Sequence, residues 1–272
     1  MVFIQKANGE KEEFSENKLR TSIRRAGIPK ELEEQVVSHV KSILHEHMHT
    51  SEIYQHIVEF LKTSTSPNHR ARYSLKQAIM ELGPTGFPFE KFIARLLRRQ
   101  GYQTQTDVIA EGKCVRHEVD VIATKKEETI MVEAKFHNGP GIKTDVQVSM
   151  YTYARLEDTK QKNHFTKGLL VTNTKATNDA VAYAECVGME ILTWSYPEGQ
   201  GLRELVEQYH LHPITTLTTL SAVQKQQLLE QDIVLCSELV EKARSVLLAL
   251  PNDKKQKVIE EAQFVCSYAN QS

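Results

Sequence analysis

The chain has 272 residues with 40% hydrophobic content, so it can bury a substantial core, and its length predicts two or three small domains. Its formal net charge of -1 gives no global attraction to nucleic acid, so any such binding must come from local basic patches. The sequence has neither an apolar run that could span a bilayer nor the hydrophobic segment of a signal peptide. We therefore expect a cytoplasmic protein that does not enter a membrane.

The cysteines of the chain are Cys114, Cys186, Cys236 and Cys266, which are widely spaced and form no Cys-x-x-Cys pair. This spacing favours neither a structural zinc site nor a disulfide framework. We expect free, buried thiols in a reducing compartment.

The first block, residues 1–85, is predicted to form a β-hairpin followed by helices. The segments VFIQK and KEEFS flank Ala7, Asn8 and Gly9, and Asn-Gly is a strong signal for a hairpin turn. Three later segments repeat apolar residues at the spacing of a helix face. These faces are Leu19, Ile23 and Ala26, then Val36, Val37, Val40 and Leu44, then Ile53, Ile57, Phe60 and Leu61.

The second block, residues 86–200, begins after the Gly and Pro residues of ELGPTGFP and is predicted to be an α/β layer with mixed strands. Its opening helix, FEKFIARLLRRQGY, carries an apolar stripe that stops at Gly101. Glu90 borders that stripe rather than the solvent face, which is unusual for an acidic residue. After a β-hairpin we expect a helix around DVQVSMYTYARLE, a strand in KGLLVTNT, a helix in NDAVAYAECVG and a strand in MEILTW.

The hairpin of the second block places charged residues together. In TIMVEAKFHNG, alternation puts Glu133 and Lys135 on one face of a strand and the apolar residues on the other. The preceding HEVDVIATKKEET reads as a second strand and a charged turn. If Thr124 pairs with Thr129, Asp120 faces Glu133 directly. Two carboxylates about 5 Å apart repel each other by roughly 3 kcal/mol at an effective dielectric constant of about 20.

A divalent cation would relieve this repulsion, because hard cations such as Mg²⁺ bind through one or two carboxylates together with substrate phosphate. Lys135 could then orient a water molecule or stabilise charge on a scissile phosphate. Removing Glu133 would stabilise the metal-free protein by ending the repulsion with Asp120. The alternative is a solvated hairpin with an accidental pair of acids.

The third block, residues 201–272, is predicted to be helical, with Pro251 interrupting the run before a final helix. The segment LLEQDIVLCSEL has the pattern of two short helices joined by a tight turn. Such a block serves either oligomerisation through helix packing or DNA binding as a helix-hairpin-like module.

Glu90 on an initial helix, Asp120 at the end of one strand and Glu133-Ala134-Lys135 on the next together resemble the core of the PD-(D/E)XK nucleases. More narrowly they resemble the Mrr-like restriction endonuclease branch. GFPFEKFIARLLRRQGY matches the opening helix, HEVDVIA the acid-bearing strand and VEAKF the Glu-x-Lys strand. Gln147 falls where a glutamine often lies on the following helix. With the closing GLLVTNTKATNDAVAYAECVGMEILTW, the resemblance covers residues 86–196.

This resemblance implies an α/β/α core that hydrolyses phosphodiester bonds. Asp120 and Glu133 would be carboxylate ligands of Mg²⁺ or Mn²⁺. Lys135 would position the attacking water or the transition-state charge, while Glu90 would assist the metal site and Gln147 would support it. The alternative is a nuclease fold that has kept its acidic residues but only binds DNA.

The first block resembles the ATP cone, a regulatory nucleotide-binding domain. VFIQKANGEKEEFSENKLRTSIRRAG carries its hairpin and first helix, and TSEIYQHIVEFL and RARYSLKQA resemble its later helices. The resemblance implies that ATP or dATP binds here. Lys6 and Lys18 would supply ammonium groups to a triphosphate, and Gly9 would bring the turn backbone close to it. Glu12 and Thr50 fall where members of the family contact the nucleotide.

Ala7 departs from the family pattern, because a charged pair usually stands before the turn and here Ala7 follows Lys6. This departure predicts weaker phosphate binding. The sequence has no Gly-rich loop ending in Gly-Lys-Ser/Thr, so ATP hydrolysis is not expected. The nucleotide should act as a signal rather than as fuel.

The leading hypothesis is a nucleotide-regulated, Mg²⁺-dependent DNA endonuclease that acts in restriction or phage defence and assembles as a homo-oligomer. The alternative is a regulator that senses ATP or dATP and binds DNA through a nuclease fold without cleaving it. The substrate is duplex DNA, single-stranded DNA or RNA, since base recognition depends on groove and loop geometry. Arg95, Arg98 and Arg99 are candidate phosphate contacts, or else a solvated helix face.

Overall fold

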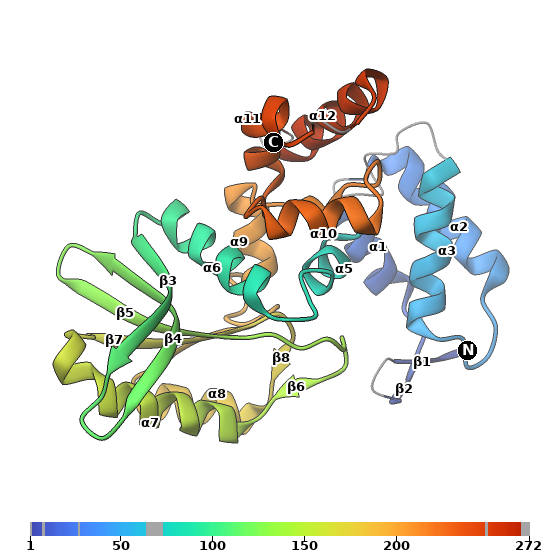
Figure 1. The fold of residues 1–272 in the computed structure, drawn as a ribbon. Helices are drawn as coiled ribbons and strands as arrows, with labels where there is room; N and C mark the ends of the chain where they lie inside the picture. The colour runs from blue at the N-terminus through green and yellow to red at the C-terminus, as the bar shows by residue number, and fades with distance from the viewer. Residues whose placement is uncertain (1, 7–8, 27, 64–72, 248–249, 268–272) are drawn as a thin grey trace.

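The N-terminal region forms a β-hairpin packed on helices in the computed structural model, which describes residues 2–6, 9–26, 28–63, 73–247 and 250–267 (Figure 1). Strands β1 (Phe3–Gln5) and β2 (Lys11–Glu13) pair antiparallel. Helices α1 (Glu16–Arg25), α2 (Lys30–Ile43) and α3 (Thr50–Thr63) follow. The hairpin prediction is confirmed, although Ala7 and Asn8 of its turn lie outside the described residues.

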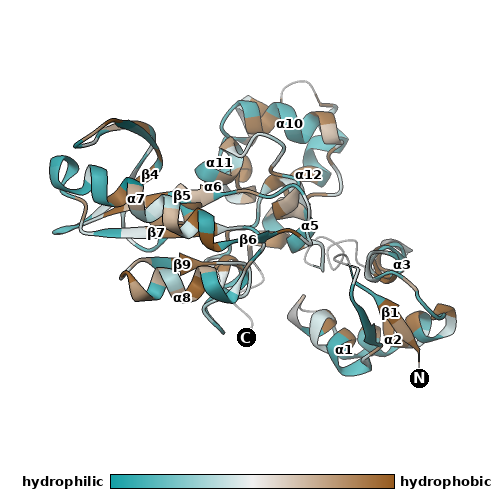
Figure 2. Cartoon of the chain, turned by 90° about the horizontal axis from the view of Figure 1, so that it is seen from below, coloured by the Kyte–Doolittle hydropathy of each residue, from teal (hydrophilic) through white to brown (hydrophobic). Residues whose placement is uncertain are grey.

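The three predicted apolar faces of this region meet in one core. Ile23, Val36 and Ile57 are fully buried there, and Leu44 and Phe60 pack at its edge. Helix α1 begins where Ser15 accepts a hydrogen bond from the Lys18 N–H, as a good N-cap residue does. Figure 2 shows this region set apart from the central sheet, each part with hydrophobic segments of its own.

The chain passes from the N-terminal core to the larger core of the central region between Tyr73 and Leu75. Tyr73 still packs against the N-terminal core, whereas Leu75, at the start of α5 (Leu75–Met80), is buried in the larger core of the central region. Helix α5 therefore belongs by packing to the part of the chain that follows it.

The central sheet has the strand order β3-β4-β5-β7-β9 and is mixed, as the sequence predicts. Strands β3 (Gln103–Glu111), β4 (Arg116–Lys125) and β5 (Glu128–Lys135) are antiparallel neighbours. Strands β7 (Lys167–Thr172) and β9 (Glu190–Leu192) continue the sheet in parallel with β5. A small parallel pair, β6 (Lys143–Thr144) with β8 (Lys175–Ala176), lies apart from it.

Helices cover both faces of the sheet, which gives an α/β/α core (Figure 1). Helix α6 (Phe87–Arg99) packs on the face that carries Ile130, Val132 and Ala134. Helices α7 (Val146–Asn163) and α8 (Asn178–Cys186) pack on the face that carries Met131. Because side chains alternate along β5, Glu133 and Lys135 belong to the α7 face.

The C-terminal region is helical, as predicted, and it shares one hydrophobic core with α6 rather than forming a separate one. It consists of α9 (Leu202–Tyr209), a 3₁₀ turn η1 (Ile214–Thr216), α10 (Ala222–Glu230), α11 (Cys236–Val246) and α12 (Asn252–Ser267). Helices α10 and α11 are the predicted pair, and Asp232 in their connection adopts φ +59°. The domain boundaries at residues 85 and 200 stay predictions.

Arg95 connects α6 to these helices through ion pairs. The interpretation of Arg95 as a phosphate contact is therefore wrong. Its side chain is buried and lies 2.7 Å from Glu238 Oε1 and 3.1 Å from Asp232 Oδ1. Arg98 and Arg99 are exposed, and Arg98 donates to the Thr104 hydroxyl.

The cysteines are free, as expected, but their predicted burial is only partly right. Cys236 is buried and Cys266 is half-buried, whereas Cys114 and Cys186 are exposed. Across the described ranges, no helix combines the length and the apolar character needed to cross a membrane.

Candidate active site

The β4–β5 hairpin has the register that brings Asp120 beside Glu133. Thr124 pairs with Thr129 and Val121 pairs with Val132, as the sequence predicts. One position further, the Asp120 carboxylate accepts a hydrogen bond of 2.7 Å from the backbone N–H of Ala134. Asp120 lies in the middle of β4 rather than at its end.

Glu133 is half-buried, with 17% of its side chain exposed, and it lies among charged side chains. Burial is the largest cause that raises its pKa, from the ordinary value of 4.5 to about 7, and the charge of Asp120 adds to it. The positive charges of Arg155 and Lys135 act in the opposite direction. The repulsion between Asp120 and Glu133 that the sequence implies is therefore present, although Arg155 compensates part of it.

Arg155 of α7 is the first residue of the site that the sequence analysis did not identify. Its guanidinium forms an ion pair with Glu133, and its side chain is only 9% exposed. Its carbon Cζ lies 5.4 Å from the centre of the Tyr151 ring, a cation–π contact. One signal was available: Arg155 falls among Ser149, Thr152, Leu156 and Thr159 on the buried stripe of α7, where an arginine needs a partner.

Glu90 reaches the same site from the first turn of α6. The helix begins after Gly86, whose φ of +82° is a left-handed conformation that favours glycine. Burial, followed by the negative charge of Asp120, raises the pKa of Glu90 to about 8. Asp107, Glu118 and Glu133 contribute further repulsion. The structure thus gathers Glu90, Asp120 and Glu133 in one electrostatic environment.

Asp107 is a second residue that the sequence analysis missed. It lies on β3 opposite Asp120, between the pairs Thr106–Val121 and Val108–Val119. Its φ of +55° is left-handed, an uncommon conformation for a residue other than glycine and one that clusters at functional sites. Because β3 was not predicted, nothing in the sequence connected Asp107 with Asp120.

Lys135 and Gln147, the two remaining predicted site residues, both have exposed side chains. Lys135 follows Glu133 by two positions on β5, hence on the same face, and its side chain is exposed. Gln147 is exposed in the first turn of α7, which Asp145 caps by accepting from the Val148 N–H. The structure therefore leaves both side chains open to solvent and to a bound substrate.

The carboxylates fit a hard divalent cation of the Mg²⁺ type. Burial raises the pKa of Asp120, Glu133 and Glu90, so each is costly to ionise and a cation nearby would offset that cost. Among the described residues, no three or more His, Cys, Asp and Glu side chains are arranged as a metal-binding group. A pair of carboxylates without such a cage is what Mg²⁺ uses when water and substrate phosphate complete its coordination.

A second cluster lies in the N-terminal region, where Glu12 forms ion pairs with both predicted phosphate-binding lysines. Glu12 Oε2 is 2.8 Å from Lys18 Nζ and 3.1 Å from Lys6 Nζ. The hydrogen bond from Lys18 is the largest cause that lowers the pKa of Glu12, and that from Lys6 adds to it. Gly9 adopts φ +83° and donates its N–H to the Lys6 carbonyl, which closes the turn.

Thr50, the first residue of α3, comes next to this cluster through a strand-like contact. Gln5 and His49 form a parallel bridge, and the Gln5 N–H donates to the Met48 carbonyl. The residues that follow the bridge, Lys6 and Thr50, are therefore neighbours. The five residues predicted to contact a nucleotide meet around the hairpin and the start of α3.

Three protein families match successive parts of the chain. Residues 2–79 match the ATP cone domain, residues 84–205 match a restriction endonuclease family, and residues 212–266 match the family described as AF1548-like, C-terminal. An uncharacterised protein of Archaeoglobus fulgidus is 41% identical over 175 residues, which are 64% of this chain and 99% of that protein.

A solved structure is also similar to this chain. It is the crystal structure of a protein of unknown function, AF1548, with a TM-score of 0.58 and 38% identity. The match covers 67% of this chain and 99% of that chain.

Proposed function

We propose that this chain, which belongs to the AF1548-like family and joins an ATP cone domain to a restriction endonuclease domain, is a DNA endonuclease. The proposed enzyme depends on Mg²⁺ and is regulated by a nucleotide. The observation that carries the proposal is the juxtaposition of Asp120 and Glu133, whose negative charges also raise the pKa of Glu90. A purely structural site gains nothing from half-buried acids that repel one another, whereas shifted pKa values of this kind are typical of active sites.

Each side chain has a defined task in this proposal. Asp120 and Glu133 would hold Mg²⁺ or Mn²⁺, which supplies Lewis acidity and lowers the pKa of a bound water when it is present. Asp120 is held in place by the Ala134 N–H. Lys135, exposed at the mouth of the site, orients the attacking water through its ammonium group and stabilises negative charge on the scissile phosphate.

Three further residues support this arrangement. Arg155 orients the Glu133 carboxylate and favours its ionised form. Glu90, at the start of α6, can hold a proton near neutral pH, because its pKa is raised to about 8. Gln147, exposed at the start of α7, is available to a bound substrate.

The ATP cone region provides the regulatory part of the proposal. Lys6 and Lys18 would bind the phosphates of ATP or dATP, with Gly9, Glu12 and Thr50 around them. A nucleotide must compete with Glu12 for both lysines, because that carboxylate contacts them in the structure. The nucleotide is a signal here, and the enzyme is a cytoplasmic homo-oligomer that acts in restriction or phage defence.

One observation favours a second candidate, a DNA-binding regulator that senses a nucleotide and does not cleave. Arg155 already neutralises Glu133, so the site can keep its acids without a metal ion. In that case Asp120 and Glu133 would serve only to position α7 against the sheet.

The decisive experiment is cleavage of plasmid and single-stranded DNA with Mg²⁺ or with a chelator, in the presence and absence of ATP. We expect Mg²⁺-dependent cleavage that is lost in Asp120→Asn, whose amide oxygen can still accept from the Ala134 N–H. Glu157→Gln is the matched control, because Glu157 is an exposed carboxylate on α7 whose partner is the nearby Lys160. DNA binding without cleavage under every condition would favour the regulator.

A further inference from the structure

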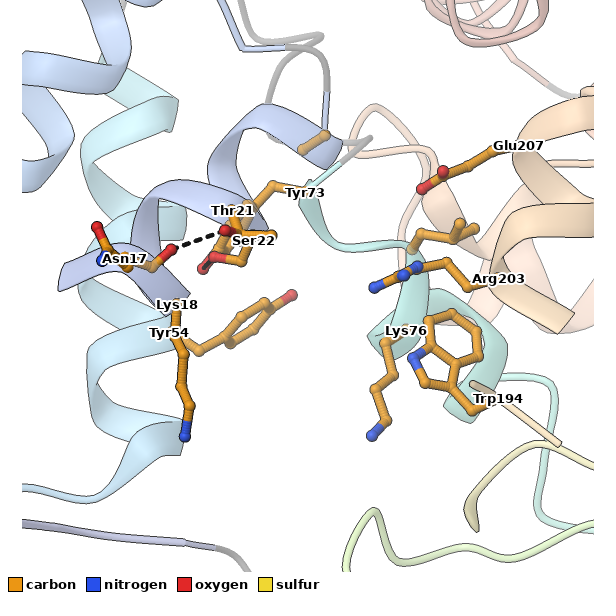
Figure 3. A pocket seen from close by; sticks show the side chains of 12 residues that line it. Asn17, Lys18, Thr21, Ser22, Tyr54, Tyr73, Lys76, Trp194, Arg203 and Glu207 are labelled. Carbon is orange, nitrogen blue, oxygen red and sulfur yellow. Dashed lines mark hydrogen bonds between the residues drawn. The ribbon is translucent and has the colours of Figure 1, made fainter. Parts of the chain in front are cut away.

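A cavity of about 500 Å³ lies between the N-terminal region and the rest of the chain (Figure 3). Lys18 of α1 and Tyr54 of α3 line one side, and Lys76 of α5, Trp194 and Arg203 of α9 line the other. Its volume is within the range of small-molecule sites. Nothing in the sequence analysis connected these residues.

The two sides of the cavity belong to different hydrophobic cores. The N-terminal core ends at Tyr73, and the larger core begins at Leu75. A second cavity of about 470 Å³ lies on another side of α5, between α3 and the segment around Thr216. The two regions thus meet around α5 with space on either side of it, and a ligand in the first cavity would contact both.

The charge of the cavity suits an anion. Among its lining residues in the described part of the chain, Lys18, Lys76 and Arg203 are cationic and Glu207 is the acid. In Figure 3 the guanidinium of Arg203 points into the cavity, opposite α1. Three cations that line one cavity from two regions favour an anionic ligand such as a polyphosphate over a neutral one.

The cations on the nuclease side are also held in place. Lys76 Nζ lies 5.9 Å from the centre of the Trp194 ring, and burial followed by the charge of Lys175 lowers the pKa of the Lys76 ammonium. Arg203 pairs with Glu204 through its terminal nitrogen, while its buried Nε has no hydrogen-bond partner in the described ranges. A desolvated ammonium and an incompletely satisfied guanidinium both gain from an anionic ligand.

Lys18 connects this cavity with the cluster in the ATP cone region. It lines the cavity and its Nζ lies 2.8 Å from Glu12 Oε2, which also contacts Lys6. A triphosphate bound at Lys6 and Lys18 would therefore lie at the edge of the cavity that Lys76 and Arg203 line from the other side.

We propose that the triphosphate of a nucleotide held by the ATP cone region enters this cavity and is bound from the other side by Lys76 and Arg203. The nucleotide then cross-links the regulatory region to the nuclease region. This inference rests on the proposed nucleotide binding and adds the route by which it reaches the nuclease. A ligand that contacts both regions favours one relative arrangement of them and biases whatever depends on it.

The test uses Trp194, the single tryptophan of the chain, as a reporter in the full-length protein. ATP is titrated while tryptophan fluorescence is excited at a wavelength that adenine does not absorb, and calorimetry measures binding in parallel. We expect the fluorescence change and the calorimetric signal to reach half of their maximum at the same ATP concentration. ADP should bind more weakly than ATP, and AMP more weakly than ADP. Inorganic tripolyphosphate should produce the same fluorescence change at higher concentration.

Two variants separate the new contacts from the cone itself. Lys76→Met keeps the aliphatic packing over Trp194, and Arg203→Ala removes the guanidinium. Each should weaken ATP binding about tenfold or more, the effect of one lost charge-assisted contact. Lys242→Ala, an exposed position on α11, is the matched control and should bind as the wild type does. Circular dichroism checks folding, and Lys76→Met provides the test if Arg203→Ala is unstable.

The outcomes distinguish this inference from the proposed function. ATP binding of wild-type affinity in both variants, with constant Trp194 fluorescence, would overturn the cross-link and leave the cone site intact. Loss of binding in Lys6→Ala together with wild-type binding in Lys76→Met and Arg203→Ala would have the same meaning. Absence of heat and of fluorescence change for every nucleotide would overturn both the cross-link and the nucleotide regulation.

Discussion

The nuclease site and the ATP cone site combine the same kinds of side chain, but they differ in how far these side chains are buried and in how their charges are paired. In the nuclease site Glu133 pairs with a buried arginine, Arg155, and burial raises the pKa of Glu90, Asp120 and Glu133. In the cone, one carboxylate, Glu12, lies between Lys6 and Lys18, and its pKa is lowered.

This difference shows that burial and local charge balance, rather than residue type, decide what a cluster of charged side chains can bind. A buried excess of acids is costly until a cation arrives. Exposed lysines that are paired with carboxylates are satisfied at rest but can offer their cations to a stronger anion. The first site is suited to a metal ion and the second to a triphosphate.

The largest effect is expected for Glu133→Ala, which removes the only carboxylate that pairs with Arg155 in the described structure. An unpaired buried guanidinium costs about 3 to 5 kcal/mol, so the free energy of unfolding should fall by that order. Denaturant titration measures it. The double variant Glu133→Ala/Arg155→Met should recover most of the loss, and an unchanged midpoint in Glu133→Ala would show that the acid-rich site does not depend on this pair.

Lys135→Ala tests catalysis without that structural loss. Its exposed side chain contributes little packing, so the thermal midpoint should stay almost constant while cleavage falls by about 10² to 10³. Cleavage of plasmid DNA and a thermal scan give the two readings. Lys113→Ala, an exposed lysine of the β3–β4 turn, serves as the control. Cleavage at the wild-type rate in Lys135→Ala would refute its role.

Lys18→Ala removes one of the two lysines that pair with Glu12 in the ATP cone region. ATP or dATP binding should weaken by about 1.5 to 3 kcal/mol, the size of a charge-assisted hydrogen bond. Calorimetry on the full chain measures this change. Lys41→Ala is the control, because Lys41 is an exposed lysine whose partner is Glu16 rather than Glu12. Equal affinity in both variants would mean that Lys18 is only a solvated charge.

Nucleotide occupancy should also change the assembly that carries the nuclease. One active site of this type cuts one strand, so duplex cleavage needs two sites brought together, most simply in a symmetric homo-oligomer. A regulatory ligand shifts such an equilibrium by about 1 to 3 kcal/mol, or roughly 5- to 150-fold in activity near the assembly midpoint. Light scattering with and without ATP or dATP should report different masses, with cleavage changing in step. Identical masses and cleavage at saturating nucleotide would refute the coupling.

The smallest effect concerns pH and the nuclease site alone. The pKa of Glu90 is raised from 4.5 to about 8 in the folded protein. The free energy of unfolding is therefore unaffected below pH 4.5 and falls as pH rises from about 4.5 through 8. After allowance for solvent screening, the loss in the presence of a chelator should be about 1 to 2 kcal/mol. Glu90→Gln should flatten this dependence, and Mg²⁺ should restore stability at high pH. Metal-free stability that does not vary with pH would contradict the raised pKa.

Much of the fold follows from local pattern. The apolar stripe of FEKFIARLLRRQGY predicts α6 and its end near Gly101, and alternation in TIMVEAKF predicts β5 and its two faces. The turn between Thr124 and Thr129 fixes the register that brings Asp120 to Glu133. Strand β3 could not be predicted in the same way, because most of QTQTDVIAE is polar and only Ala110 is buried in it.

The sequence by itself determined which acids share a face, since the spacing of two along a strand and one turn register are local properties. Only the tertiary structure decided what neutralises them. Arg155 comes from a helix beyond the strand, and its ion pair reverses the predicted effect of removing Glu133 from stabilising to destabilising. In the same way Arg95 is predicted either to contact phosphate or to lie on a solvated helix face, but it is buried against Glu238. The partner of a long side chain depends on which elements the core brings together, and periodicity carries no information about that choice.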